Sequence, residues 1–122
     1  MATILLVEDD PLVRLVLQEE LIDCGYLVIG VPDATTAINR MTTGDAIDVL
    51  LTDVNLPGTM SGIELAAWMT DNAPAVLTLV MSGRHEAKEQ VDLLCKNARF
   101  FPKPFWAGDV DAHIQAERPL LK

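Results

Sequence analysis

The segment ILLVEDDP, residues 4–11, decides how the rest of the chain is read. Four apolar residues run directly into three acids, Glu8, Asp9 and Asp10, although neighbouring carboxylates repel one another. A buried strand that ends in such a cluster indicates a site for a cation or a positively charged partner. Pro11 suits the first turn of a helix, so the segment predicts a strand, an acidic loop and a helix in succession.

The alternation of apolar and amphipathic stretches continues along the chain. Short apolar runs typical of buried strands cover residues 3–7, 26–31, 47–52, 75–81 and 99–101. Helical patterns lie after Asp10-Pro11 up to Gly25, after Asp33 up to Gly44, after Ser61, from Glu86 to Asn97, and after Pro104-Phe105. Strands that are apolar on both faces require helices on both sides of a parallel sheet. We therefore predict an α/β, flavodoxin-like (βα)5 fold, with a doubly wound parallel five-stranded sheet in the strand order 2-1-3-4-5.

Composition limits the size and the partners of the protein. Half of the 122 residues are hydrophobic, and no repeat or linker divides residues 1–122, so one domain is expected. The net charge of −9 disfavours direct binding to nucleic acid or to an anionic membrane. No apolar run reaches the roughly 18 residues of a membrane span, so a cytoplasmic location is expected. Cys24 and Cys95 lack metal-site spacing and are expected to be reduced core residues.

Chemically useful side chains recur where the predicted strands end. They are Glu8, Asp9 and Asp10 after the first strand, Asp53 after the third, Ser82 after the fourth and Lys103 after the fifth. All strands of a parallel sheet point the same way, so these side chains are expected at one edge, where ligands bind in such sheets. The first and third strands are neighbours in the predicted order, which brings Asp53 beside the opening acids.

Four motifs, in their order along the chain, resemble the receiver domains of two-component response regulators: VEDD, LLTDVNLPG, VMSG and FFPKPF. The resemblance is to single-domain regulators of the chemotaxis type, and it covers essentially the whole chain. It implies that Glu8 and Asp9 are the acidic pair, Asp53 the phosphoacceptor, Ser82 the conserved hydroxyl and Lys103 the invariant lysine. Asp10 falls one place beyond the pair and is expected to cap the first helix.

The resemblance implies phosphoryl transfer to Asp53 with the help of Mg²⁺. This ion prefers oxygen ligands and offsets the repulsion between a carboxylate and a phosphoryl group. Asp9 and Asp53 are expected to ligate it directly and Glu8 through water, and the resemblance adds the backbone carbonyl of Asn55. The clustered acids of the opening segment are thereby explained, because a dication belongs among them.

The remaining site residues are assigned to catalysis, switching and the lifetime of the aspartyl phosphate. Lys103 would hold one phosphoryl oxygen and Ser82 would donate to another. Phe100 stands three places before the lysine, where the family often has an aromatic that changes rotamer, and would move when Ser82 moves. Gly83 replaces the usual Ala and would admit water, whereas Arg84 would shield the phosphoryl group. We expect Arg84 to have the larger effect.

Three departures from the family pattern lie near the expected site. The loop after Asp53 carries one extra residue around PGTMSG, and Phe100 lacks the hydroxyl of the commoner Tyr. Pro102 removes a backbone donor near the end of the last strand. The resemblance also predicts a cis Lys103-Pro104 peptide bond.

We therefore expect a phosphoacceptor switch with intrinsic phosphotransfer and autodephosphorylation activity, rather than a metabolic enzyme. Its phosphodonor would be a sensor histidine kinase or a histidine phosphotransfer protein, and phosphorylation would change the surface that binds a downstream protein. A monomer or weak dimer is expected, and Met1 favours a native N-terminus.

Three alternatives stay open. One is a receiver that works as a constitutive docking module. A Mg²⁺-dependent phosphohydrolase with an aspartate nucleophile would usually carry a D-x-D motif and a substrate-covering insertion. A flavodoxin-like cofactor binder would need a hydroxyl- and glycine-rich phosphate loop in place of the opening acids.

Overall fold

Five parallel strands form one sheet in the order β2-β1-β3-β4-β5, which confirms the predicted topology. The computed structural model describes residues 1–84, 87–95 and 98–119. The strands are β1 (Thr3–Val7), β2 (Leu27–Val31), β3 (Val49–Asp53), β4 (Leu77–Ser82) and β5 (Ala98–Pro102). The helices are α1 (Pro11–Asp23), α2 (Ala34–Thr42), α3 (Gly62–Asn72), α4 (Ala87–Leu94) and α5 (Ala107–Glu117). The predicted helix limits at Glu86 and Asn97 lie outside the described residues.

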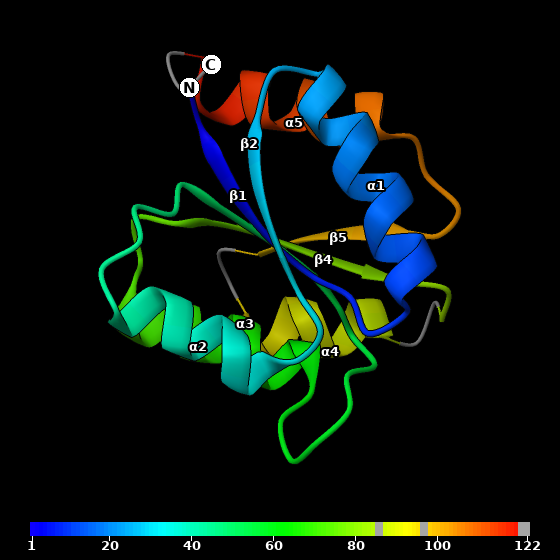
Figure 1. The fold of residues 1–122 in the computed structure, drawn as a ribbon. Helices are drawn as coiled ribbons and strands as arrows, with labels where there is room; N and C mark the ends of the chain where they lie inside the picture. The colour runs from blue at the N-terminus through cyan, green and yellow to red at the C-terminus, as the bar shows by residue number, and fades with distance from the viewer. Residues whose placement is uncertain (85–86, 96–97, 120–122) are drawn as a thin grey trace.

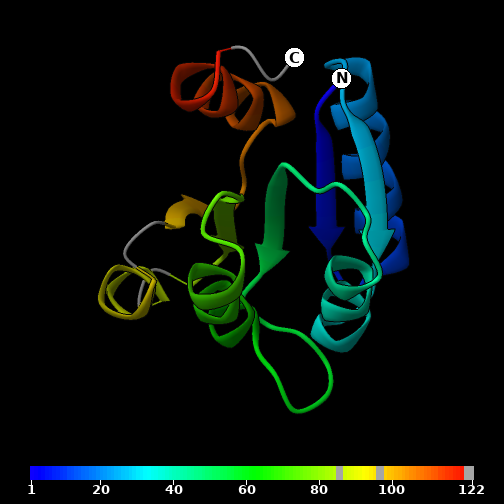
Figure 2. The ribbon, with the colours of Figure 1, turned by 90° about the vertical axis from the view of Figure 1, so that its left-hand side faces the viewer.

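Helices cover both faces of the sheet (Figure 1; Figure 2). On one face α1 and α5 pack against the strands, with Leu21 and Ile114 fully buried there. On the other face α2 and α3 enclose a second apolar cluster around Leu65 and Met69, and α3 and α4 enclose a third. The strands β1 and β3 are buried along nearly their whole length, as expected for central strands covered on both sides.

Three predicted strands begin too early: the runs predicted from residues 26, 47 and 75 precede the starts of β2, β3 and β4 at Leu27, Val49 and Leu77. Tyr26 and Ile47 belong to apolar runs and are buried, yet they precede β2 and β3. An apolar run indicates that its residues are buried, whereas a strand also requires pairing with the backbone of a neighbouring strand. At the other end, Asp53 and Ser82 are themselves the last strand residues, paired with Met81 and Pro102 respectively.

The helix α1 begins at a capped turn and leaves an apolar surface exposed. Asp10 accepts hydrogen bonds from the backbone N–H groups of Leu12 and Val13, which confirms its predicted capping role. Leu12 is 69% exposed, and Leu15 and Val16 are about half exposed on the same helix. In the part of the chain that the structure describes, no helix has the length and apolar character that a membrane span requires.

The loop of residues 54–61 leaves the sheet and returns to it at almost the same point. The Gly62 N–H donates to the Val54 carbonyl over 2.8 Å, and Ser61 caps α3 in a reciprocal pair with Glu64. A Cβ atom at Gly62 would lie 1.8 Å from the carbonyl oxygen of Asp53, so only glycine fits there. Between these anchors the loop projects from the body of the protein (Figure 1).

Candidate functional site

The carboxyl ends of β1, β3, β4 and β5 bring four of the predicted residues to one edge of the sheet. Glu8 follows β1, Asp53 ends β3, Ser82 ends β4 and Lys103 follows β5. Glu8, Asp53 and Ser82 are all buried. Ionisable groups in such positions need partners, because an unpaired buried charge is costly.

Lys103 supplies the positive charge of this edge. Its Nζ lies 2.7 Å from Asp53 Oδ2 and 4.0 Å from Glu8 Oε1. The Lys103 backbone N–H donates to the Ser82 carbonyl over 2.8 Å, which ties the loop after β5 to the end of β4. The Lys103-Pro104 peptide bond is cis, as predicted.

The second oxygen of Asp53 is held by its own loop. The Asn55 backbone N–H donates to Asp53 Oδ1 over 3.1 Å. This is a local turn of the kind that Asp favours, and it fixes the carboxylate at the mouth of the β3–α3 loop. Asp53 therefore presents one oxygen to Lys103 and one to the backbone of Asn55.

Glu8 is the most perturbed acid of the site. Burial raises the pKa of Glu8 to about 8, a hydrogen bond with Asp53 and the Asp53 charge act in the same direction, and the Lys103 charge opposes them. As a carboxylate, Glu8 leaves its buried Oε2 atom without a hydrogen-bond donor among the described residues. A buried oxygen of this kind beside a second carboxylate suits a hard cation.

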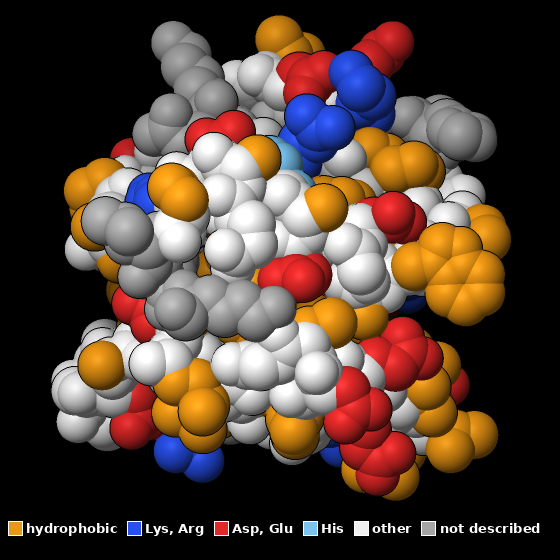
Figure 3. Space-filling view, turned by 90° about the horizontal axis from the view of Figure 1, so that it is seen from above, with side chains coloured by type: hydrophobic (Ala, Val, Ile, Leu, Met, Phe, Trp, Pro, Cys, Tyr) orange, Lys and Arg blue, Asp and Glu red, His pale blue; other side chains and the backbone are white. Residues whose placement is uncertain are grey.

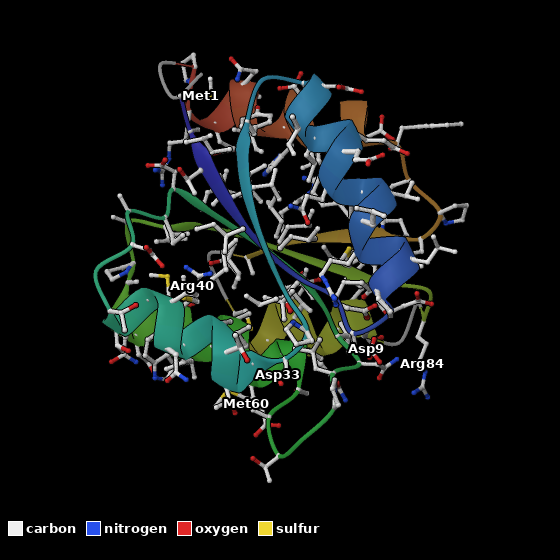
Figure 4. The ribbon with its side chains drawn as sticks, in the orientation of Figure 1. Met1, Asp9, Asp33, Arg40, Met60 and Arg84 are labelled. Atoms are coloured by element: carbon white, nitrogen blue, oxygen red, sulfur yellow. The ribbon has the colours of Figure 1, made fainter. Side chains whose placement is uncertain are left out.

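Asp9 differs from Glu8 and Asp53 in being exposed, although its charge is close enough to contribute to the raised pKa of Glu8. It is exposed in the β1–α1 loop, at the same edge of the sheet as Arg84 (Figure 4). Within residues 1–84, 87–95 and 98–119, no three His, Cys, Asp or Glu side chains form a ready metal-binding group. Mg²⁺ commonly uses only one or two carboxylates, completed by water and phosphate oxygens, so the oxygen-rich edge at Glu8 and Asp53 fits this ion.

The β4–α4 connection joins the site through Ser82. The Arg84 backbone N–H donates to Ser82 Oγ over 3.0 Å, whereas the exposed Arg84 side chain extends outward from the sheet edge (Figure 4). Arg84 also lines a cavity of about 260 Å³ with Asn55. A Cβ atom at Gly83 would have nothing within 4 Å, so this position opens toward solvent.

Phe100 lies on β5, away from the carboxylates. It is half-buried and packs against the cluster between α3 and α4, which includes Val80 and Val91. Its β5 neighbour Phe101 is buried on the opposite face of the sheet. Phe100 is thus coupled to α4 by packing.

The contacts of Arg14 and Gly62 with the site were not predicted from the sequence. Arg14 donates from Nη1 to the Glu8 carbonyl over 2.6 Å and so anchors the acidic loop to α1. Arg14 lies one helical turn after the capping Asp10, which could have indicated a contact with the acidic loop, but many helices carry an exposed arginine at that position. Gly62 touches Asp53, and a glycine directly after a capping serine gives no sign of that contact.

An open parallel sheet with acids and a lysine at its carboxyl edge places the chain among the doubly wound α/β proteins, which bind ligands at that edge. Within that class, residues 4–115 match the response regulator receiver domain, and the chain belongs to this family.

Relatives of known sequence agree with this assignment. The chain is 31% identical over 114 residues to the two-component response regulator PhoP of Pseudomonas aeruginosa, a match that covers 93% of this chain and 50% of PhoP. It is 33% identical to the protein PetR of Rhodobacter capsulatus, with 93% and 47% covered. The chain thus spans about half the length of these curated relatives.

Solved structures share the fold. A response regulator receiver protein from Sinorhizobium medicae superposes with a TM-score of 0.87 at 25% identity, with 99% of this chain and 97% of that chain covered. The response regulator TrrA of Thermotoga maritima, in complex with Mg²⁺-BeF, gives a TM-score of 0.84 at 24% identity, with 95% and 98% covered. These likenesses confirm the predicted fold.

Proposed function

We propose that this receiver domain accepts a phosphoryl group on Asp53 from a phosphohistidine of a sensor histidine kinase or histidine phosphotransfer protein. The observation that carries the proposal is the buried Asp53 carboxylate, held 2.7 Å from Lys103 and beside Glu8 at the carboxyl edge of the sheet. A lysine at that distance offsets the negative charge beside the phosphoacceptor, and its ammonium can also meet an incoming phosphoryl oxygen.

Mg²⁺ would be held by the acidic residues of this edge. Asp9 and Asp53 are proposed as direct ligands, Glu8 as a ligand through water, and the Asn55 carbonyl as a further oxygen. The ion would neutralise negative charge on the phosphoryl oxygens during transfer. The complex of TrrA with Mg²⁺-BeF, in a relative of the same fold, supports this choice of metal.

Asp53 carries out the chemistry in two steps. A carboxylate oxygen attacks phosphorus, the P–N bond to the donor imidazole breaks, and the electron pair stays with the departing histidine. Lys103 would hold one phosphoryl oxygen, and the Ser82 hydroxyl would donate to another. Water then attacks phosphorus, which regenerates the Asp53 carboxylate and releases inorganic phosphate.

The switch would pass from Ser82 to Phe100. Movement of Ser82 toward the phosphoryl group would leave space on the α4 side of the sheet, and Phe100 is packed against that side. A change there would alter the surface formed by α4, β5 and α5, which is where we propose a downstream protein binds.

The phosphodonor is proposed to dock on α1. A cavity of about 680 Å³ separates α1 from the loop after β5 and is lined by Leu12, Val16, Lys103 and Phe105 among others. Exposed apolar residues next to the site lysine suit the apolar face of a helical partner. The donor histidine would then reach Asp53 over the same edge.

Intact mass spectrometry tests the proposal directly. The protein is incubated with a small phosphodonor and Mg²⁺, and a gain of one phosphoryl group is expected in the wild type and in the control Asp71→Asn, which removes an exposed acid from α3. Asp53→Asn should gain none. Full phosphorylation of Asp53→Asn would refute the nucleophile assignment, and an unmodified wild type would favour a constitutive docking receiver.

A further inference from the structure

A second polar cavity lies at the opposite end of the sheet from Asp53. Its volume is about 400 Å³, within the range of small-molecule sites. The amino ends of β4 and β5 form its floor, and the end of α5 forms one wall. Arg99, His113, Arg118 and Glu117 line it together with apolar side chains that include Val76.

The two arginines of this cavity have no acidic partner among the described residues, as is also true of Arg14 and Arg84. Lys103, Lys88 and Arg40 each form an ion pair. Arg99 and Arg118 form none with the residues that the structure describes, although the whole chain carries 18 acids and a net charge of −9. Figure 3 shows positive side chains beside a histidine toward one edge of the face seen from above, with acidic side chains next to them and elsewhere on the same face.

The positions of the three basic groups are set by packing. The Phe101 ring lies 5.7 Å from the His113 ring in an edge-on contact, and the Arg99 guanidinium carbon lies 5.9 Å from the Phe101 centroid. Arg118 donates from Nη1 to the Ala75 carbonyl over 3.1 Å, which leaves its other N–H groups available. The cavity therefore presents two guanidinium groups, an imidazole and an apolar wall.

We propose that this cavity binds a small organic oxyanion, a carboxylate or phosphate ester carried on an apolar body. Arginine forks match the planar or tetrahedral oxygens of such groups, and the apolar side chains would contact the body of the ligand. Among the described residues, Glu117 is the one acid lining the cavity, and it should weaken binding. The proposal is independent of phosphorylation at Asp53.

The titration of His113 agrees with an anion site. Burial lowers the pKa of His113, the Arg99 charge lowers it further, and the Glu117 charge opposes both. Arg118 is the remaining charged group at the cavity in the part of the chain that the structure describes. A bound anion would offset the unfavourable field of Arg99 and favour the imidazolium, so binding should tighten as the pH falls from about 7.5 to about 5.5.

Proton and nitrogen NMR titrations with benzoate and with phenyl phosphate test the site. The His113 ring signal, assigned with His113→Gln, should shift saturably with at least one probe in the wild type. Arg99→Gln and Arg118→Gln should each weaken that probe about tenfold, the loss expected for one charge-assisted contact. Glu117→Gln should tighten it.

Arg40→Gln is the matched control, because it removes the same charge from exposed α2. It should leave the affinity unchanged. Benzoate, which stays ionised across the pH range used, should also bind more tightly at the lower pH if it is the probe that saturates. A His113 signal that saturates with neither probe, or equal losses in Arg40→Gln and Arg99→Gln, would overturn the proposal.

Discussion

Lys103 Nζ lies 2.7 Å from Asp53 Oδ2, although the two residues are 50 positions apart in the sequence. The contact exists because β3 and β5 point the same way on either side of β4, so that their carboxyl ends reach one edge. Among the described ion pairs, Lys103 is the cation that contacts Asp53, the proposed nucleophile. Lys103 is therefore the first residue to test after Asp53.

Lys103→Met should lower the rate of phosphorylation by a small phosphodonor about 100-fold while the fold is retained. The ammonium would otherwise stabilise charge on the transferred group, and removal of one such donor typically has this effect. The rate is followed by intact mass against time. Lys88→Met, in an exposed pair with Asp92, is the control and should react at the wild-type rate. A wild-type rate in Lys103→Met would contradict the assigned role.

The metal-free protein should lose stability as the pH rises. Glu8 has a pKa of about 8 when folded and an ordinary value of 4.5, so the folded state binds the proton more tightly. The free energy of unfolding contributed by Glu8 is therefore fully present below about pH 4.5 and falls as the pH rises through about 8. Urea unfolding in EDTA measures it. Glu8→Gln should show a flatter pH dependence, and identical slopes in the two proteins would disprove this account.

Arg84→Ala should shorten the lifetime of the aspartyl phosphate about tenfold, since one charge-assisted contact to the phosphoryl oxygens is lost. The substitution keeps the backbone N–H that donates to Ser82 Oγ, so it isolates the side chain. Mass spectra recorded after removal of the donor measure the lifetime. Gly83→Ala should act in the opposite direction, because its methyl group enters open space and hinders water. A longer lifetime in Arg84→Ala would reverse our assignment.

Phe100→Ala should still be phosphorylated but should lose the response of α4 and β5. The cavity left beside Val80 and Val91 should also lower stability by about 1–3 kcal/mol, because Phe100 is only half-buried. Amide NMR shifts on addition of a phosphodonor and Mg²⁺ report the response. Leu93→Ala, which truncates a side chain 77% exposed on α4, should respond like the wild type. An unchanged response in Phe100→Ala would remove Phe100 from the switch.

Gly62→Ala should destabilise the protein by about 3 kcal/mol and disturb Asp53. Its Cβ atom would lie 1.8 Å from the Asp53 carbonyl oxygen, so α3 or the end of β3 must move. Gly108→Ala is the control, because position 108 in α5 has open space and alanine favours helix by up to about 1 kcal/mol. Chemical denaturation compares them. Equal stabilities for the two variants would show that the contact at Gly62 relaxes easily.

Most of the site could be predicted from the sequence because the sheet topology determines where the strand ends lie. Once the apolar runs are read as parallel strands, Asp53, Ser82 and Lys103 must meet at one edge, whatever their rotamers. Burial of Glu8 and exposure of Asp9 were beyond such reasoning, since both follow β1 and only the packing of the loop distinguishes them.

Contacts made by side chains from distant loops were equally out of reach. Arg99, His113 and Arg118 each look like ordinary surface residues along the sequence, and their common cavity depends on how α5 ends against the loop before β4. The approach of Gly62 to Asp53 depends on the course of a loop whose length varies freely in principle.

Both ends of the 54–61 loop are fixed against the sheet, so the length of the loop can change without a change at the neighbouring Asp53. The hydrogen bond between Gly62 and Val54, and the absence of a side chain at Gly62, hold both ends against the sheet. The tip between these ends is free to vary in length, since Gly58 there has a φ of +94° and faces solvent. The tip around PGTMSG is therefore a point at which an epitope or a fluorescent label can be grafted without moving Asp53.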